Sequence, residues 1–290
     1  MSTKIRTLII GLGKIGLYYD YHIKKKSYLT HSSTVKNHPH FNLSGGVDLK
    51  KKNREMFEKK FLKKTYSNLS SALKAAKPDL IIISYDCKNI LNIILKILEN
   101  NTPKFILFEK PFITNINHFS KVKKILLKNK INFRVNLQRS FNKKYTQTFE
   151  KIFKNNNNKK IIVNYTGKFL SNAVHYLFLL SPFVNKIKEI KKNKDLIIIK
   201  TKNLEILFIK LRFDYSMNKM EIFSNNDLFT LSGRDEKFNI YIKSKDKLYN
   251  NVNILKNKGV INLNSKLNQK IVMDEISKFN NNHFETLKFC

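Results

Sequence analysis

Three glycines near the N-terminus are the first residues whose spacing points to chemistry. The phrase G-L-G-K-I-G at residues 11–16 follows an apolar run and precedes a segment, residues 17–19, that can continue as a helix. A strand, this pattern and a helix in that order are typical of a turn that binds a dinucleotide pyrophosphate. The glycines allow a tight bend, close approach of the backbone to phosphate, and close packing of helix on strand. We therefore expect cofactor contacts from Gly11, Gly13, Lys14, Ile15 and Gly16.

An acidic residue is expected about twenty residues beyond such a turn, where it binds the ribose. Asp48, at the end of the second apolar strand, is the candidate, although residues 21–40 make its distance from Gly16 longer. A carboxylate there accepts hydrogen bonds from a ribose 2′-hydroxyl and repels a 2′-phosphate, which favours NAD over NADP. Lysines at positions 50–52 could neutralise a phosphate, so NADP stays open, and Asp48 could also be an ordinary turn residue.

The phrase Glu109-Lys110-Pro111 comes directly after a buried strand. Ligands of open α/β sheets bind beyond the carboxyl ends of the strands, and Pro111 favours an extended Lys110 there. A partly desolvated lysine has a lowered pKa and can donate or accept a proton. Taken alone, a lysine before a proline is more often a surface residue.

A third candidate segment, residues 167–176, opens a helix in the second half of the chain and contains Lys168, Asn172 and His175. The histidine could serve as an acid or base. An isolated histidine in an apolar helix is more often a core residue, and this alternative stays open.

The first half of the chain has the elements needed to position these residues. Strands are predicted near 6–10, 42–47, 79–84, 105–108 and 132–137, with a short strand or loop near 64–66. Helices are predicted near 51–61, 89–99 and 117–128, and a small helix is predicted to begin at residue 68 or 70. This alternation predicts a doubly wound parallel sheet of the Rossmann type. After residue 138 the pattern of predicted elements changes. Helices are predicted at 144–153, near 172–180 and at 267–279, and strands at 160–165, 196–201, 204–213, 219–223 and 238–242. Successive strands without crossover helices predict a mostly antiparallel sheet. We therefore expect a Rossmann domain at 1–138 and an α+β substrate and oligomerisation domain at 139–290.

The charge is extreme, with 56 Lys and Arg against 21 Asp and Glu, which gives +35. A nucleic-acid-binding protein is one interpretation, because cations gain affinity by releasing counterions from phosphate. The excess is nearly all lysine, spread along the whole chain, and it accompanies many Asn, Ile, Phe and Tyr residues, which favours compositional drift. We expect no specific nucleic-acid partner.

Cys87 and Cys290 cannot form a disulfide framework and match no zinc pattern, so we expect a reducing, cytoplasmic location and no metal. No apolar run is long enough to cross a bilayer, and the N-terminus does not resemble a signal peptide, so no membrane partner is expected.

The order of these motifs resembles the Gfo/Idh/MocA oxidoreductase family, whose members include glucose–fructose oxidoreductase and inositol dehydrogenase. The resemblance rests on the glycine turn, the E-K-P phrase, the V-H-Y of residues 174–176, Thr30-His31 before Gly46-Val47-Asp48, and the arginine-containing phrase at 138–142. It covers residues 5–180.

The resemblance implies a hydride transfer between NAD(P) and a sugar, cyclitol or nucleotide-sugar hydroxyl or ketone. It implies Lys110 as the principal acid/base and His175 as its partner. It further implies cofactor contacts from Ser84, Tyr85 and Glu109, and substrate contacts from Arg139, Lys168 and Asn172.

The chain departs from the family pattern in places. The aspartate common four residues before the helical histidine is Ser171 here, and residues 84–89 lack the usual proline and histidine. A catalytically weakened relative that binds a dinucleotide or sugar as a sensor or scaffold is therefore the alternative hypothesis. A homo-oligomer is expected through the open face of the antiparallel sheet.

Overall fold

The computed structural model describes residues 3–85, 89–112, 116–154, 158–232, 236–249, 252–263 and 269–278. The chain divides into two compact units. The first contains the residues up to Phe141 together with the C-terminal helix, and the second begins at Asn142.

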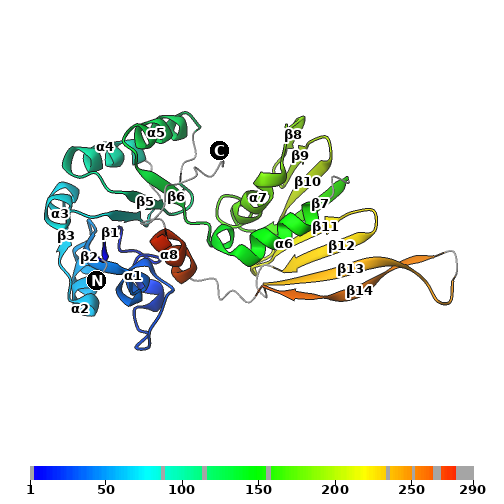
Figure 1. Cartoon of the computed structure of the whole chain (residues 1–290), viewed down its shortest axis with the longest axis horizontal. Coiled ribbons are helices and arrows are strands. Elements are labelled where there is room, and N and C mark those ends of the chain that lie inside the picture. Colours follow the sequence, from blue (N-terminus) through cyan, green and yellow to red (C-terminus); the bar gives the residue numbers. More distant parts are fainter. Residues whose placement is uncertain are drawn as a thin grey trace. The chain divides into compact units, whose positions relative to one another are not determined.

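The first unit is built on a parallel sheet with strand order β3-β2-β1-β4-β5-β6 (Figure 1). Its strands are β1 (Ile5–Ile10), β2 (Phe41–Val47), β3 (Thr65–Tyr66), β4 (Leu80–Ile83), β5 (Phe105–Phe108) and β6 (Asn132–Val135). Its helices are η1 (Tyr18–Asp20), α1 (His31–Asn37), α2 (Lys51–Phe61), α3 (Leu69–Ala76), α4 (Ile90–Asn100), α5 (Ile116–Lys128), η2 (Gln138–Phe141) and α8 (Gln269–Lys278). The predicted Rossmann-type sheet is confirmed.

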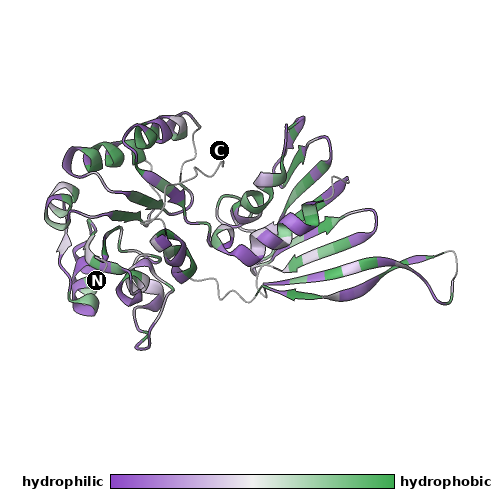
Figure 2. Ribbon diagram, viewed as in Figure 1, coloured by the Kyte–Doolittle hydropathy of each residue, from purple (hydrophilic) through white to green (hydrophobic). Residues whose placement is uncertain are grey.

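Helices cover both faces of this sheet, which explains its continuous apolar strands. Ile9, Ile82 and Leu107 point to a core shared with α1, α2 and α8, while the alternate residues point to a core shared with α3, α4 and α5. Because both faces are buried, the central strands β4 and β5 are apolar at every position rather than at every second one. Figure 2 shows these strands largely in green.

The second unit is built on an eight-stranded sheet with the order β14-β13-β12-β11-β7-β10-β9-β8. Its strands are β7 (Lys159–Thr166), β8 (Glu189–Lys192), β9 (Leu196–Lys200), β10 (Leu204–Leu211), β11 (Asn218–Phe223), β12 (Asp227–Ser232), β13 (Lys237–Lys245) and β14 (Asn253–Asn262). Its helices are α6 (Lys143–Phe153), α7 (Val174–Leu180) and η3 (Ser181–Phe183). The pairing is antiparallel except between β7 and β10, so the predicted mostly antiparallel sheet is confirmed. Helices α6 and α7 pack on one face of it.

Sequence analysis missed β8, β12 and β14. β8 and β14 are the two edge strands of the sheet, and they carry lysines or asparagines among few apolar residues because they are partly solvated. β12 is an inner strand of only six residues, in which polar residues interrupt the apolar ones.

The C-terminal helix α8 belongs to the first unit rather than to a second domain that runs to the C-terminus. Val272, Met273 and Ile276 are buried in the first unit's core, and each such side chain contributes roughly 1.5–3 kcal/mol. His38 Nε2 also contacts Asp274 Oδ1 on α8 at 3.0 Å. The division between the units falls after Phe141 instead of residue 138, because η2 packs with α8.

Candidate functional site

The candidate site lies at the carboxyl edge of the parallel sheet, where the strand order reverses between β1 and β4. The strand ends are joined there, because Ser84 N donates to Ile10 O at 2.8 Å and Gly11 N donates to Val47 O at 2.8 Å. Open α/β sheets bind their ligands at such a switch point. The glycine turn follows β1, Asp48 follows β2, and Glu109 and Lys110 follow β5.

The structure gives a separate reason for glycine at each of the three positions in the turn. Gly11 has a φ of +93°, which disfavours other residues. A Cβ on Gly16 would lie 2.2 Å from Gly11 O, so the turn closes on itself only with glycine there. A Cβ on Gly13 would meet nothing within 4 Å, so space is open over this glycine. Backbone next to open space fits the approach of a pyrophosphate.

The prediction that a helix continues through residues 17–19 is wrong in its detail, because the chain forms only the short 3-10 helix η1 there and then leaves the helical path. After the short η1, it returns as α1, and His31 N donates to Ile15 O at 3.0 Å. These residues are sixteen apart where a regular α-helix separates partners by four, so residues 19–30 form a twelve-residue excursion. Without it, the 32 residues from Gly16 to Asp48 would be 20, the spacing usual in dinucleotide-binding turns.

Asp20 anchors this excursion. Its buried carboxylate accepts from Thr30 N at 3.1 Å, Thr30 Oγ1 at 2.8 Å and Ser33 Oγ at 2.9 Å, and Lys60 Nζ lies 3.6 Å away. Burial opposes its ionisation, but hydrogen bonds from Ser27, Thr30 and Ser33 outweigh burial and hold the pKa of Asp20 below its ordinary value.

Asp48 clamps the glycine turn to the end of β2. Its Oδ2 accepts from Leu12 N at 2.8 Å and from Asn53 Nδ2 at 3.0 Å, and its Oδ1 accepts from Lys50 N at 2.8 Å. A carboxylate offers about four acceptor positions, so one remains for a ribose hydroxyl. Arg54 Nη1 donates to Asp48 O at 2.9 Å, which places a guanidinium beside this residue.

Ser84 and Tyr85 line the turn from the end of β4. The Ser84 hydroxyl donates to Ile10 O at 3.0 Å and also contacts Gly11 O. The Tyr85 ring stands where a Cβ on Gly11 would be, with Cδ1 2.7 Å from it. The rest of the predicted 84–89 segment falls partly on residues 86–88, which lie outside the described residues.

Glu109 and Lys110 carry the ionisable groups of the site. The buried Glu109 accepts from His31 Nε2 at 2.8 Å, from the Asn136 amide, and from Lys110 N at 3.3 Å. Burial opposes its ionisation, but the contacts with His31 and Asn136 outweigh burial and hold the pKa of Glu109 below its ordinary value. Burial lowers the pKa of Lys110; the negative charge of Glu109 opposes this shift, and the positive charge of Arg139 adds to it.

Of the remaining predicted residues, Arg139 lies on η2 in the first unit. Lys168, Asn172 and His175 lie in the second unit, in the segment that runs from the turn after β7 to the start of α7. Lys168 is exposed and His175 is half-buried near the start of α7. The Asn172 amide donates to Thr166 O at 2.6 Å, so it holds the turn in which Gly167 has a φ of +77°.

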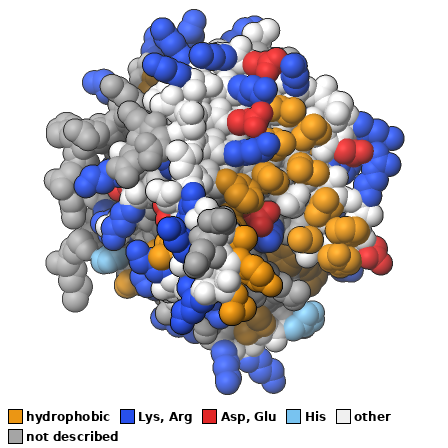
Figure 3. Space-filling view, turned by 90° about the vertical axis from the view of Figure 1, so that its right-hand side faces the viewer, with side chains coloured by type: hydrophobic (Ala, Val, Ile, Leu, Met, Phe, Trp, Pro, Cys, Tyr) orange, Lys and Arg blue, Asp and Glu red, His pale blue; other side chains and the backbone are white. Residues whose placement is uncertain are grey.

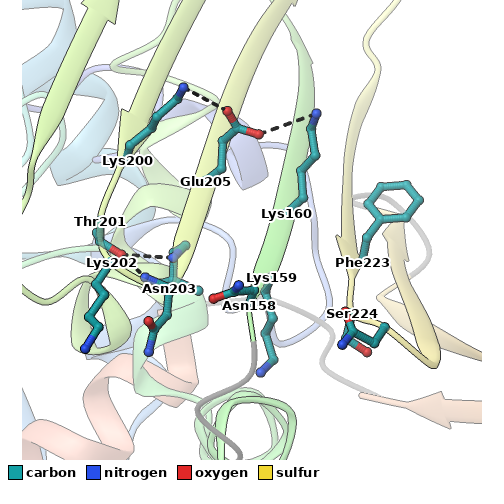
Figure 4. Close-up of a pocket in the computed structure, with 12 residues that line it drawn as sticks. Asn158, Lys159, Lys160, Lys200, Thr201, Lys202, Asn203, Glu205, Phe223 and Ser224 are labelled. Atoms are coloured by element: carbon teal, nitrogen blue, oxygen red, sulfur yellow. Dashed lines mark hydrogen bonds and ion pairs between the residues drawn. The ribbon is translucent and has the colours of Figure 1, made fainter.

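A separate depression of about 390 Å³ lies at the other end of β7 (Figure 4). Glu205 sits there between Lys160 and Lys200, at 3.4 Å from each amine. None of the predicted site residues lines this depression, so we assign it no part in cofactor or substrate binding.

Sequence reasoning missed several residues around the site. Asn53 and Arg54 support Asp48 from the first turns of α2, and Asn136 and Gln269 join Glu109 from segments far apart in the chain. Only the placement of Asn53 and Arg54 just after Asp48 was a local signal. Among the described residues, no three His, Cys, Asp or Glu side chains gather into a group that could hold a metal ion.

Comparison with known proteins identifies the first unit. Residues 5–137 match the Gfo/Idh/MocA family, described as "Oxidoreductase family, NAD-binding Rossmann fold". A comparison of the sequence with curated proteins finds no match. No helix in the described part of the chain is both long and apolar enough to cross a membrane.

Solved structures share the fold at low sequence identity. A dehydrogenase from Clostridium difficile superposes with a TM-score of 0.68 and 17% identity, covering 94% of this chain and 90% of that one. The WlbA dehydrogenase from Chromobacterium violaceum, in complex with NADH and UDP-GlcNAcA, has a TM-score of 0.69 and 13% identity, with 96% and 86% covered. A 3-ketoreductase from Actinomadura kijaniata, in complex with TDP-benzene and NADP, has a TM-score of 0.70 and 9% identity, with 95% and 89% covered.

Proposed function

We propose that this chain, whose residues 5–137 match the Gfo/Idh/MocA oxidoreductase family, is an NAD(P)-dependent dehydrogenase or reductase of a sugar, cyclitol or nucleotide sugar. The observation that carries the proposal is the meeting of three features at one sheet edge. They are the open backbone over Gly13, the Asp48 carboxylate and the half-buried Lys110. The similar structures with NADH or NADP and a nucleotide-linked ligand support this substrate class.

The residues of the glycine turn fit a dinucleotide. Gly11, Gly13 and Gly16, with Lys14 and Ile15, would hold the pyrophosphate, and Asp48 would hold the ribose. Ser84, Tyr85 and Glu109 would complete the cofactor contacts from the ends of β4 and β5. When bound, the nicotinamide supplies hydride transfer to or from the substrate carbon.

Lys110 is the proposed acid/base. As a neutral amine it takes the proton from the substrate hydroxyl during oxidation, and as an ammonium ion it returns a proton to the oxygen during reduction. A lowered pKa increases the neutral fraction near physiological pH, which suits the first role. Arg139, Lys168, Asn172 and His175 are proposed as substrate contacts, with His175 as the second acid/base.

Cofactor choice is proposed as NAD, with NADP as the alternative. The Asp48 carboxylate disfavours a 2′-phosphate. Arg54 and the exposed Lys50 would favour one, which is the specific reason that NADP is retained.

We further propose a homo-oligomer that forms through the face of the second sheet opposite α6 and α7. Ile162, Leu207 and Ile198 are register neighbours on that face and remain partly exposed in one chain. Figure 3 shows hydrophobic side chains gathered in a band beside basic and acidic side chains. An apolar sheet face of this kind is stabilised when a second copy covers it.

A thermal-shift titration with NAD, NADH, NADP and NADPH, each alone and then with UDP- or TDP-sugars, tests the proposed function. A ligand that binds only the native state raises its stability in proportion to RT ln(1 + [L]/Kd). The proposal expects one cofactor pair to stabilise the protein and turnover with one of the sugar classes. If the cofactor binds and no sugar or polyol changes its absorbance, the sensor or scaffold alternative is correct.

A further inference from the structure

Four buried polar side chains form a cluster next to Lys110, whose chain neighbour Glu109 is one of them. His31, Glu109, Asn136 and Gln269 are 0%, 9%, 3% and 1% exposed, and they come from α1, the end of β5, the end of β6 and the start of α8. Asn136 N also donates to Phe108 O at 2.7 Å, so the ends of β5 and β6 are joined at this point. Burying four polar groups in a core is costly unless each is hydrogen-bonded.

The chemistry of the carboxylate fixes the direction of each hydrogen bond. An ionised Glu109 only accepts, so both His31 Nε2 and the Asn136 amide nitrogen must donate to it. The second N–H of the Asn136 amide donates to Gln269 Oε1 at 2.9 Å, which fixes the orientation of the amide. His31 Nδ1 is buried without a hydrogen-bond partner among the described residues, so the tautomer with a proton on Nε2 is the one that this pocket accommodates.

We infer that His31 is a positioning residue: together with Asn136 it holds Glu109 as a buried anion, and Glu109 in turn fixes the backbone and the charge environment of Lys110. This inference deepens the proposed function, because it concerns how the proposed acid/base is held. The link to Lys110 is direct, since Glu109 Oε2 accepts from Lys110 N at 3.3 Å and the two residues are neighbours in the chain. None of His31, Asn136 or Gln269 is required to touch a substrate for this role.

Competitive labelling of the full chain with acetic anhydride, followed by peptide mass spectrometry, measures the pH midpoint at which each lysine amine loses its proton. In Glu109→Gln the midpoint of Lys110 should fall by about one unit, since an adjacent opposite charge shifts a pKa by about 1–3 units. In His31→Leu it should rise by roughly half a unit toward its ordinary value, because a carboxylate with one donor fewer acts more strongly on a nearby ammonium ion. His31→Gln, whose amide reaches about as far as Nε2, should keep the wild-type midpoint.

Lys159 provides an internal control, because burial also lowers its pKa and it lies in the second unit. Its midpoint should be the same in all variants. If His31→Leu does not fold by circular dichroism, His31→Asn replaces it, since its amide is too short to reach Glu109.

The inference is overturned if the Lys110 midpoint is unchanged in a folded Glu109→Gln, His31→Leu or His31→Asn variant. It is also overturned if the midpoint changes in His31→Gln. In either case His31 is only a packing residue. The labelling needs neither cofactor nor substrate. Absence of turnover would therefore contradict the proposed function but would not change the result of the labelling.

Discussion

His31 N donates to Ile15 O at 3.0 Å, and so the first helix of the Rossmann unit resumes twelve residues after it was interrupted. The next residue repeats the pattern, since Ser32 N donates to Gly16 O at 3.3 Å. The helical path is thus preserved across the excursion, and Asp48 keeps its usual place relative to the glycine turn. The same junction delivers the His31 side chain to Glu109.

Asp20→Ala should destabilise the fold, because it leaves buried donors of Thr30 and Ser33 unsatisfied. Each such donor costs roughly 1–3 kcal/mol, so a loss of at least that size is expected in urea unfolding. Asp20→Asn, which keeps an acceptor oxygen, should lose less. Equal stability of Asp20→Ala and wild type would show that the excursion is not anchored by this carboxylate.

The loss of stability at acid pH should depend partly on the same residue, Asp20. The pKa of Asp20 is lower in the folded than in the unfolded chain, so its contribution is fully present above the unfolded value of about 3.8. The contribution is lost as the pH falls through the folded pKa. Unfolding free energies measured from pH 6 to pH 2 should therefore fall more steeply for wild type than for Asp20→Asn, and parallel curves would contradict this.

The two later glycines of the turn should respond oppositely to alanine. Gly16→Ala places a Cβ 2.2 Å from Gly11 O and should cost about 1–3 kcal/mol or more of stability. Gly13→Ala meets nothing within 4 Å, so stability should stay within about 1 kcal/mol of wild type. The space over Gly13 is where phosphate is proposed to bind, so NADH fluorescence titration should show at least a tenfold weaker affinity, which an unchanged Kd would refute.

The main strands and crossover helices of the first unit, the glycine turn and the E-K-P phrase could be predicted because each depends on a local run of residues. Ile81 and Ile82 show this, since a strand buried on both faces must be apolar throughout. His31, Asn136 and Gln269 could not be predicted, because they meet only through the tertiary fold and no local pattern marks a buried polar residue. The excursion did leave a signal in the long spacing between Gly16 and Asp48, but its position within that segment depends on hydrogen bonds that the sequence does not display.

Lys110→Ala should lower turnover by about 10²–10⁴-fold with little change in cofactor affinity, since its amine is proposed to move only the substrate proton. In wild type, oxidation should rise with pH to an apparent midpoint below the ordinary lysine value of 10.5, because burial lowers the pKa of Lys110. Lys110→Arg keeps the charge but cannot deprotonate, so it should be as inactive in oxidation as Lys110→Ala. Normal turnover by either variant would remove Lys110 from the mechanism.

Leu207→Glu should convert the proposed oligomer to monomers. Leu207 faces away from α6 and α7, beside Ile198 and Ile162, so a carboxylate there is solvated in a single chain and desolvated in an interface. Sedimentation equilibrium should give the mass of one 34.2 kDa chain for this variant and a multiple of it for wild type. Leu62→Glu, at a position 87% exposed in the first unit, is the matched control and should leave the mass unchanged. A wild-type protein that is already monomeric at micromolar concentration would refute the interface, and an oligomer that survives Leu207→Glu would place it on another surface.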